Sequence, residues 1–114
     1  MFGFNKKKKN NNYDEYYKLQ KALKYYNHKE WYDWCDSEEN KRFKHLETLI
    51  IKAYKTVNIE ADLLGRRLNK SFTREDYLED FKIFFEPKIF DKLKEWCREY
   101  EMFRVKEQKL LDNV

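Results

Sequence analysis

The sequence predicts an all-α protein, and three observations lead to that prediction. The 114 residues include only two glycines and one proline, so the chain has few of the residues that tight turns between strands require. Apolar residues recur at helical spacing over most of the chain, and residues that favour helix N-termini precede these stretches. We therefore expect one domain over residues 13–114, a compact bundle of five or six helices, preceded by a flexible basic tail at residues 1–12.

The expected tail joins four lysines, Lys6 to Lys9, to three asparagines, Asn10 to Asn12. Like charges and polar amides bury nothing, and this favours mobility. The first helix is expected to begin near Asn12, which is a good N-cap residue. Its apolar residues share one face: Tyr16, Leu19, Leu23 and Tyr26.

Two further helices are predicted before residue 58. Asn27 and Glu30 have the spacing of an N-cap and its N3 residue, so a short helix should follow that carries Trp31, Trp34 and Cys35. Ser37 then predicts the start of a third helix over about residues 38–57. One face of this helix is apolar and should be buried: Phe43, Leu46, Ile50, Ala53, Tyr54 and Val57. The opposite face is mostly basic: Lys41, Lys44, His45, Thr48, Lys52 and Lys55.

The second half of the chain predicts three more helical segments. A short helix is expected from about Glu60 to Leu68. Thr73 and Asp76 resemble another helix N-terminus, followed by the apolar residues Tyr77, Leu78, Phe81, Phe84 and Phe85. Pro87 should end that helix and begin the last one, which runs past residue 105. The last helix should bury Phe90, Leu93, Trp96, Cys97, Tyr100 and Phe103.

Ala61 and Gly65 resemble the beginning of a helix-turn-helix, in which a small residue lets two helices approach and a glycine permits the turn. The recognition helix would then begin near Thr73, with Arg74 at its start. The segment between Gly65 and Thr73 is longer than the usual turn, and this helix also carries acidic residues that phosphates would repel: Glu75, Asp76, Glu79 and Asp80. One longer helix ending at Asn69 therefore stays open as the alternative.

The distribution of charge gives the main indication of function. Residues 41–74 hold nine basic and three acidic side chains, whereas acidic side chains outnumber basic ones in residues 10–40 and in residues 75–114. Clustered cations bind phosphates, and arginine side chains also read guanine edges. We expect a small non-enzymatic nucleic-acid-binding protein, with DNA favoured over RNA. The expected binding residues are Lys41, Lys44, Lys52, Lys55, Arg66, Arg67, Lys70 and Arg74.

The alternative is a protein–protein interaction module, an adaptor or an inhibitor of a host or replication enzyme, with no direct contact to nucleic acid. Polarised charge would then steer a protein partner. Tyr17, Tyr25 and Tyr32 lie off the apolar stripes and are candidate contacts for it. Even for a DNA-binding protein, a replication or recombination enzyme is a candidate partner. Phe2, Phe4 and the following lysines would give only marginal attachment to a membrane surface, so a membrane partner is not expected.

Other function classes find little support in the sequence. His28 and His45 have no further ligands at convincing spacing, so no metal is expected, and no glycine-rich loop or nucleophile with a neighbouring base indicates an enzyme or a cofactor. Cys35 and Cys97 are too few for a disulfide scaffold, and we expect a cytoplasmic protein with both thiols reduced. Nine tyrosines and nine phenylalanines beside many lysines and asparagines are typical of an AT-rich genome, which favours a low-GC bacterium or its phages and other mobile genetic elements.

Overall fold

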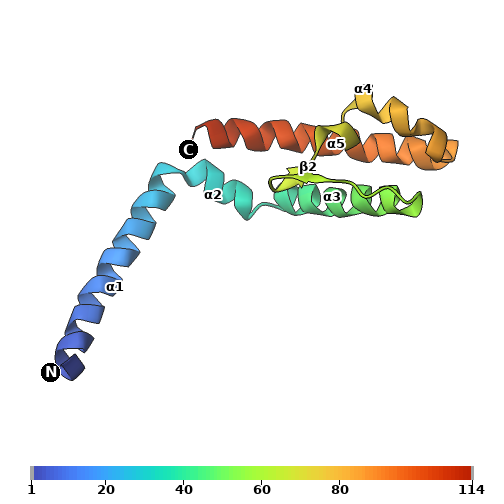
Figure 1. Ribbon diagram of the computed structural model, residues 1–114. Coiled ribbons are helices and arrows are strands. Elements are labelled where there is room, and N and C mark those ends of the chain that lie inside the picture. Colours follow the sequence, from blue (N-terminus) through green and yellow to red (C-terminus); the bar gives the residue numbers. More distant parts are fainter. Residues whose placement is uncertain (1, 114) are drawn as a thin grey trace.

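Helices account for 79% of the computed structural model, which describes the backbone of residues 2–113 and the side chains of residues 14–113. The all-α prediction is confirmed (Figure 1). The α-helices of the described residues are α1 (Phe2–Asn27), α2 (Lys29–Cys35), α3 (Glu38–Thr56), α4 (Glu75–Leu78) and α5 (Pro87–Asp112). Two 3₁₀ helices, η1 (Lys70–Phe72) and η2 (Glu79–Phe84), and a small hairpin of β1 (Leu63–Leu64) and β2 (Arg67–Leu68) complete the fold.

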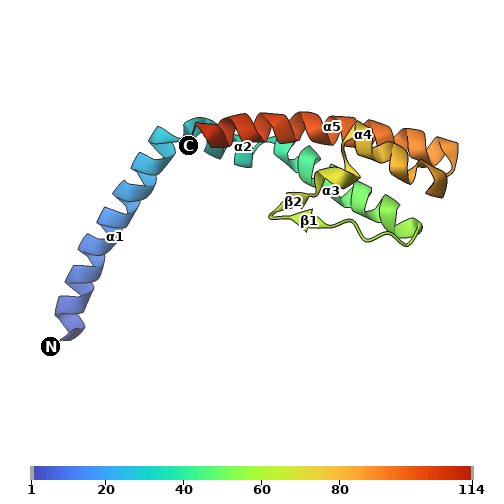
Figure 2. The same cartoon turned by 45° about the horizontal axis from the view of Figure 1, so that its top comes forward.

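The core lies between α3 and α5, which run side by side in both ribbon views (Figures 1 and 2). Both predicted apolar faces meet there. The buried apolar residues of α3 are Phe43, Leu46, Ile50, Ala53 and Tyr54, and those of α5 include Phe90, Leu93, Cys97, Tyr100 and Phe103. Val57 and Trp96, which were also expected to be buried, are only partly buried. Ring contacts connect the two helices, with the Phe43 and Tyr100 centroids 4.7 Å apart. Burial of these large side chains supplies most of the driving force that holds the helices together.

Both ends of α3 are well defined. At its N-terminus the Ser37 hydroxyl accepts a hydrogen bond of 3.1 Å from the backbone amide of Asn40, so Ser37 is the N-cap, as the sequence predicts. At its C-terminus Asn58 adopts a left-handed conformation with φ of 61°. The amides of Asn58 and Ile59 bond back to the Lys55 and Tyr54 carbonyls, which is a Schellman motif. The chain therefore turns sharply after α3 and returns along it.

The helix expected from Glu60 to Leu68 does not form, and the prediction was wrong. This segment is extended and closes the hairpin, in which Leu63 pairs with Leu68 and Leu64 with Arg67. Gly65 has φ of +65° and begins the two-residue loop, a position that glycine occupies without strain. The described residues therefore contain no helix-turn-helix at this point, and the longer helix ending at Asn69 is absent too.

The helix expected from Thr73 is shorter than predicted. Its N-cap is Arg74 rather than Thr73. Thr73 instead ends η1, because its backbone amide donates to the Lys70 carbonyl and its side chain is buried. After Leu78 the chain tightens into η2, and Pro87 occupies the first turn of α5 as predicted. Phe84 is exposed rather than buried, whereas Leu78 and Phe85 enter the core.

α1 projects away from the paired helices and extends the molecule to 70 Å in its longest dimension (Figure 2). Its backbone begins at Phe2, before the predicted start near Asn12, because lysine is a good helix former and no proline interrupts the segment. The side chains of residues 1–13 lie outside the described part, so a flexible tail at residues 1–12 stays a prediction. The apolar face expected to be buried is exposed: Tyr16, Leu19, Leu23 and Tyr26.

The joint between α1 and α2 is held by side chains. α2 has His28 rather than Asn27 as its N-cap, and that residue makes no capping bond with its side chain. The Tyr25 hydroxyl donates a hydrogen bond to Asp33 at 3.0 Å, and the Tyr25 ring lies 5.7 Å from that of Tyr32. Two of the tyrosines that fall off the apolar stripes thus contact each other at this joint.

Candidate nucleic-acid interface

The outer face of α3 carries lysines that make no ion pair in the described part of the chain: Lys44, Lys52 and Lys55. Lys44 and Lys55 are eleven residues apart, so they project in nearly the same direction about 16 Å from each other. The only acidic residue between Asn40 and Thr56 is Glu47. Its carboxylate accepts a hydrogen bond of 2.6 Å from the Tyr100 hydroxyl and so faces α5. The outer face is therefore basic along the length of the helix.

Lys41 extends this face toward its N-terminus. Its ammonium lies 3.1 Å from the Glu38 carboxylate, with the two side chains 69% and 89% exposed. Exposed pairs of this kind contribute only about 0–1 kcal/mol. A phosphate can therefore replace Glu38 as the partner of Lys41 with little loss.

Arg66 and Lys70 add two further exposed cations from a different part of the chain. Arg66 occupies the hairpin loop, and Lys70 opens η1 directly after the hairpin. Neither side chain has an ion pair in the described residues. The hairpin lies beside α3 in both views (Figures 1 and 2), so these cations extend the basic region beyond the helix.

The side chains of two predicted binding residues already form ion pairs within the protein. Arg67 donates to both carboxylate oxygens of Glu107, at 2.9 and 2.6 Å, and its guanidinium lies 4.4 Å from the centre of the Phe43 ring. Arg74 pairs with Asp76 at 2.8 Å. Arg67 is thus a structural residue that fastens the hairpin to α5. Its Nε and Nη2 groups already donate to Glu107, and its contact with nucleic acid stays a prediction.

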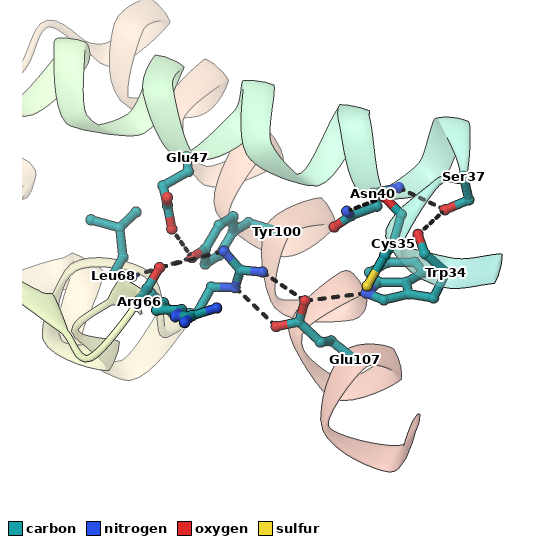
Figure 3. A network of polar contacts seen from close by, with 10 residues as sticks. Trp34, Cys35, Ser37, Asn40, Glu47, Arg66, Leu68, Tyr100 and Glu107 are labelled. Atoms are coloured by element: carbon teal, nitrogen blue, oxygen red, sulfur yellow. Dashed lines mark hydrogen bonds and ion pairs between the residues drawn. The ribbon is translucent and has the colours of Figure 1, made fainter. Parts of the chain in front are cut away.

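The Glu107 carboxylate is the centre of a polar network (Figure 3). Besides Arg67, it accepts a hydrogen bond of 3.1 Å from the Trp34 indole of α2. Burial by itself would raise the pKa of the Glu107 carboxyl, but the hydrogen bonds from Arg67 and Trp34 outweigh it and lower the pKa. Glu107 therefore stays ionised and joins α2, the hairpin and α5 at one point.

A groove of about 780 Å³ opens beside this network. Its walls come from α2, the first half of α3, the hairpin and the second half of α5. The cations that line it are Lys44, Arg66, Arg67, Lys70 and Arg104. Glu107 is the one acidic side chain among the described residues that line it, and Arg67 balances its negative charge. Lys44 belongs both to the groove and to the outer face of α3, so the two basic surfaces are continuous.

Several residues that line the groove are not predicted from the sequence, among them Trp31, Asn40 and Arg104. Trp31 packs against the core and also lines the groove. Arg104 donates to the Leu68 carbonyl and lies over the Tyr100 ring. The helical spacing of Arg104 to Glu107 indicates a place in the groove only once the hairpin is known to pack on that face of α5. That packing has no local signal in the sequence.

The described residues offer little to metal chemistry or to a membrane span. They contain no group of three or more histidine, cysteine or acidic side chains arranged to hold a metal ion. None of their helices combines the length and apolar character needed to cross a bilayer. Cys35 and Cys97 are free thiols, the first exposed and the second buried.

No protein-family model matches the chain, and no curated protein or solved structure matches it either.

Proposed function

We propose that this is a small non-enzymatic protein that binds nucleic acid, DNA in preference to RNA, through the outer face of α3 and the adjoining groove. One observation carries the proposal. Five exposed cations without ion pairs in the described residues come from two separate segments: Lys44, Lys52, Lys55, Arg66 and Lys70. Three of them, Lys44, Arg66 and Lys70, line the same groove. Phosphate backbones are bound mainly by such groups, through release of counterions. The proposal implies a cytoplasmic protein.

The spacing of the cations supports this reading. Projected on the axis of B-DNA, a separation of about 16 Å between Lys44 and Lys55 covers roughly five phosphates of one strand, at ~3.4 Å of axis each. Arg66 and Lys70 approach from the side, so contacts to a second segment of backbone are compatible with the same pose. Lys41 joins the same row once it exchanges Glu38 for a phosphate.

Charge reversal tests the proposal. The variant with Arg66→Glu and Lys70→Glu should bind a fluorescent 20-base-pair duplex at least roughly tenfold more weakly than the unaltered protein, as measured by anisotropy at low salt. The matched control reverses Lys88 and Lys109, two exposed lysines of α5 without ion pairs in the described residues. It changes the net charge equally and should weaken binding less than about threefold. Equal losses in both variants would show that only net charge matters and would contradict the proposed surface.

The protein-interaction alternative rests on a different observation, the exposed apolar face of α1. Leu19 and Leu23 are 57% and 48% exposed, although their spacing is typical of a buried stripe. This alternative predicts that neither duplex nor single-stranded DNA is retained even at low salt. The same titration therefore separates the two functions.

A further inference from the structure

The groove between α2, α3, the hairpin and α5 differs from a simple basic patch in three ways. It is concave, with a volume of about 780 Å³, within the range of small-ligand sites. Apolar side chains form part of its wall: Trp31, Leu64, Leu68 and Leu111. The lining also contains a buried hydrogen-bond acceptor to which no group in the described residues donates. A phosphate backbone alone needs none of these features.

The acceptor belongs to Asn40, which is only 5% exposed. Its Nδ2 donates to the Cys35 carbonyl at 3.1 Å, which fixes the orientation of the amide, and its Oδ1 then accepts no hydrogen bond. Figure 3 shows the Asn40 side chain beside Cys35 at the end of α2, and Asn40 is one of the residues that line the groove. Buried polar atoms are rarely left unpaired. A donor group on a bound ligand would satisfy this oxygen.

The cations at the rim define the other part of the ligand. Lys44, Arg66 and Lys70 have no ion pairs in the described part of the chain, whereas the two remaining arginines of the groove, Arg67 and Arg104, pair with glutamates. The ligand should therefore carry negative charge at the rim. It should also present a flat apolar surface to Trp31 and a hydrogen-bond donor to Asn40.

A nucleotide combines these three properties, because its base is flat and carries N–H donors and its phosphate is anionic. Aromatic side chains bind unpaired bases by stacking, and the contact tolerates different bases. A base that is paired within a duplex offers neither its face nor its pairing edge.

We propose that the groove holds one unpaired nucleotide of a bound strand, with its base against Trp31 and its phosphates on Lys44, Arg66 and Lys70. This inference rests on the proposed nucleic-acid function and deepens it, because it makes single-stranded or locally opened DNA the preferred ligand. The Asn40 oxygen accepts a hydrogen bond from the base. A duplex contacts the outer face of α3 together with Arg66 and Lys70 at the rim, and none of its bases enters the groove.

Cys35 provides a test in the unaltered protein, because its exposed thiol lines the groove. Cys97 serves as the internal control, since it is fully buried and burial raises the pKa of its thiol to about 12. The rate of Cys35 alkylation by iodoacetamide is measured by mass spectrometry with a 12-nucleotide single strand, with the same sequence as a duplex, and with neither. A saturating single strand should slow the reaction roughly tenfold, because only the free protein reacts. The duplex should slow it less than about twofold.

A variant pair gives a second, independent measurement. Trp31→Leu keeps an apolar side chain but removes the stacking surface, and it should weaken single-strand binding roughly tenfold while leaving duplex binding unchanged. The matched control is Trp96→Leu on α5, where the tryptophan is half-buried and lies outside the groove. It should change neither affinity. Circular dichroism confirms that both variants keep the fold.

The outcomes separate the inference from the proposed function. Equal protection of Cys35 by single strand and duplex, or no protection despite measurable binding of both, would overturn the nucleotide site and leave the basic surface intact. Failure of both DNAs to bind at low salt would overturn the inference and the proposed function together. Protection by a polyglutamate peptide but by neither DNA would overturn the inference in favour of an acidic protein ligand.

Discussion

α1 and α3 carry the same kind of apolar pattern but differ completely in what surrounds it. In α3 the residues at helical spacing are buried, with Leu46 and Ile50 at 0% exposure. In α1 the corresponding residues Leu19 and Leu23 are about half exposed, and no other part of the described chain covers them. The difference arises from α5, which packs along α3 and leaves α1 to project from the joint at α2 (Figure 1).

Apolar spacing therefore specifies a helix and its apolar face, but not the element that packs on that face. A helix gains most of its stability from packing rather than from intrinsic propensity. The body formed by α2 to α5 should therefore behave as the cooperative unit, with α1 as an independent element.

Proline in the two helices should have opposite consequences. Thr48→Pro lies on the exposed face of α3, and it should unfold the body, because it breaks the helix at a cost of about 3 kcal/mol or more and distorts the core beneath. Gln20→Pro in α1 should remove helical circular dichroism signal while the thermal unfolding temperature of the body stays nearly unchanged. Equal destabilisation by both variants would show that α1 packs on the body in solution.

Matched leucine truncations should repeat the contrast on a smaller scale. Leu46→Ala should lower the free energy of unfolding by about 2–5 kcal/mol, because it leaves a cavity between α3 and α5. Leu23→Ala should change it by less than about 0.5 kcal/mol. Urea titrations followed by tryptophan fluorescence measure both values. A large loss in the α1 variant would place Leu23 in a packed interface.

The polar network offers the next contrast, between a partly buried ion pair and an exposed one. Glu107→Gln should lower the free energy of unfolding by about 1–3 kcal/mol, since it weakens the charged hydrogen bonds to Arg67 and Trp34. Glu38→Gln should cost less than about 1 kcal/mol because its pair with Lys41 is exposed. If the two variants lost the same stability, Glu107 would not be the residue that fastens the hairpin to α5.

The dependence of stability on pH should also reflect this network, and we expect a smaller change than the substitutions produce. The folded-state pKa values of Glu107 and Glu99 are lowered, the latter by its hydrogen bonds with Arg42. The stability that these groups contribute is present above the ordinary carboxyl pKa and is lost as the pH falls through their lowered values. Urea midpoints should therefore fall from about pH 5 downwards, and more shallowly in Glu107→Gln. An equally steep fall in that variant would assign the effect to other carboxylates.

The sequence predicts the helices that bear the core, because the spacing of Phe43 to Tyr54 and of Phe90 to Phe103 matches the observed buried faces. It fails where long-range packing decides the conformation. The hairpin at Gly65 depends on Leu68 entering the core, where its amide bonds to the Tyr100 hydroxyl at 3.2 Å. The groove depends on that hairpin, so Asn40 and Arg104 have no local signal as site residues.

Of the predicted binding residues, the structure brings Lys44, Arg66 and Lys70 together at the groove and leaves Lys52 and Lys55 further along α3. Lys41, Arg67 and Arg74 have carboxylate partners within the protein instead. A count of charges along the sequence treats every cation alike, whereas the structure shows which cations are already paired with a carboxylate. That distinction is what reduces the predicted surface to five free cations.

The salt dependence of DNA affinity shows whether these five cations bind phosphates. The dissociation constant for a fluorescent duplex is measured by anisotropy at several salt concentrations and plotted on logarithmic axes. Five phosphate contacts predict that the logarithm of the association constant falls with a slope of about −4 to −5. The Arg66→Glu and Lys70→Glu variant should reduce that slope by about two. A flat plot, or no binding at the lowest salt concentration, would contradict the account.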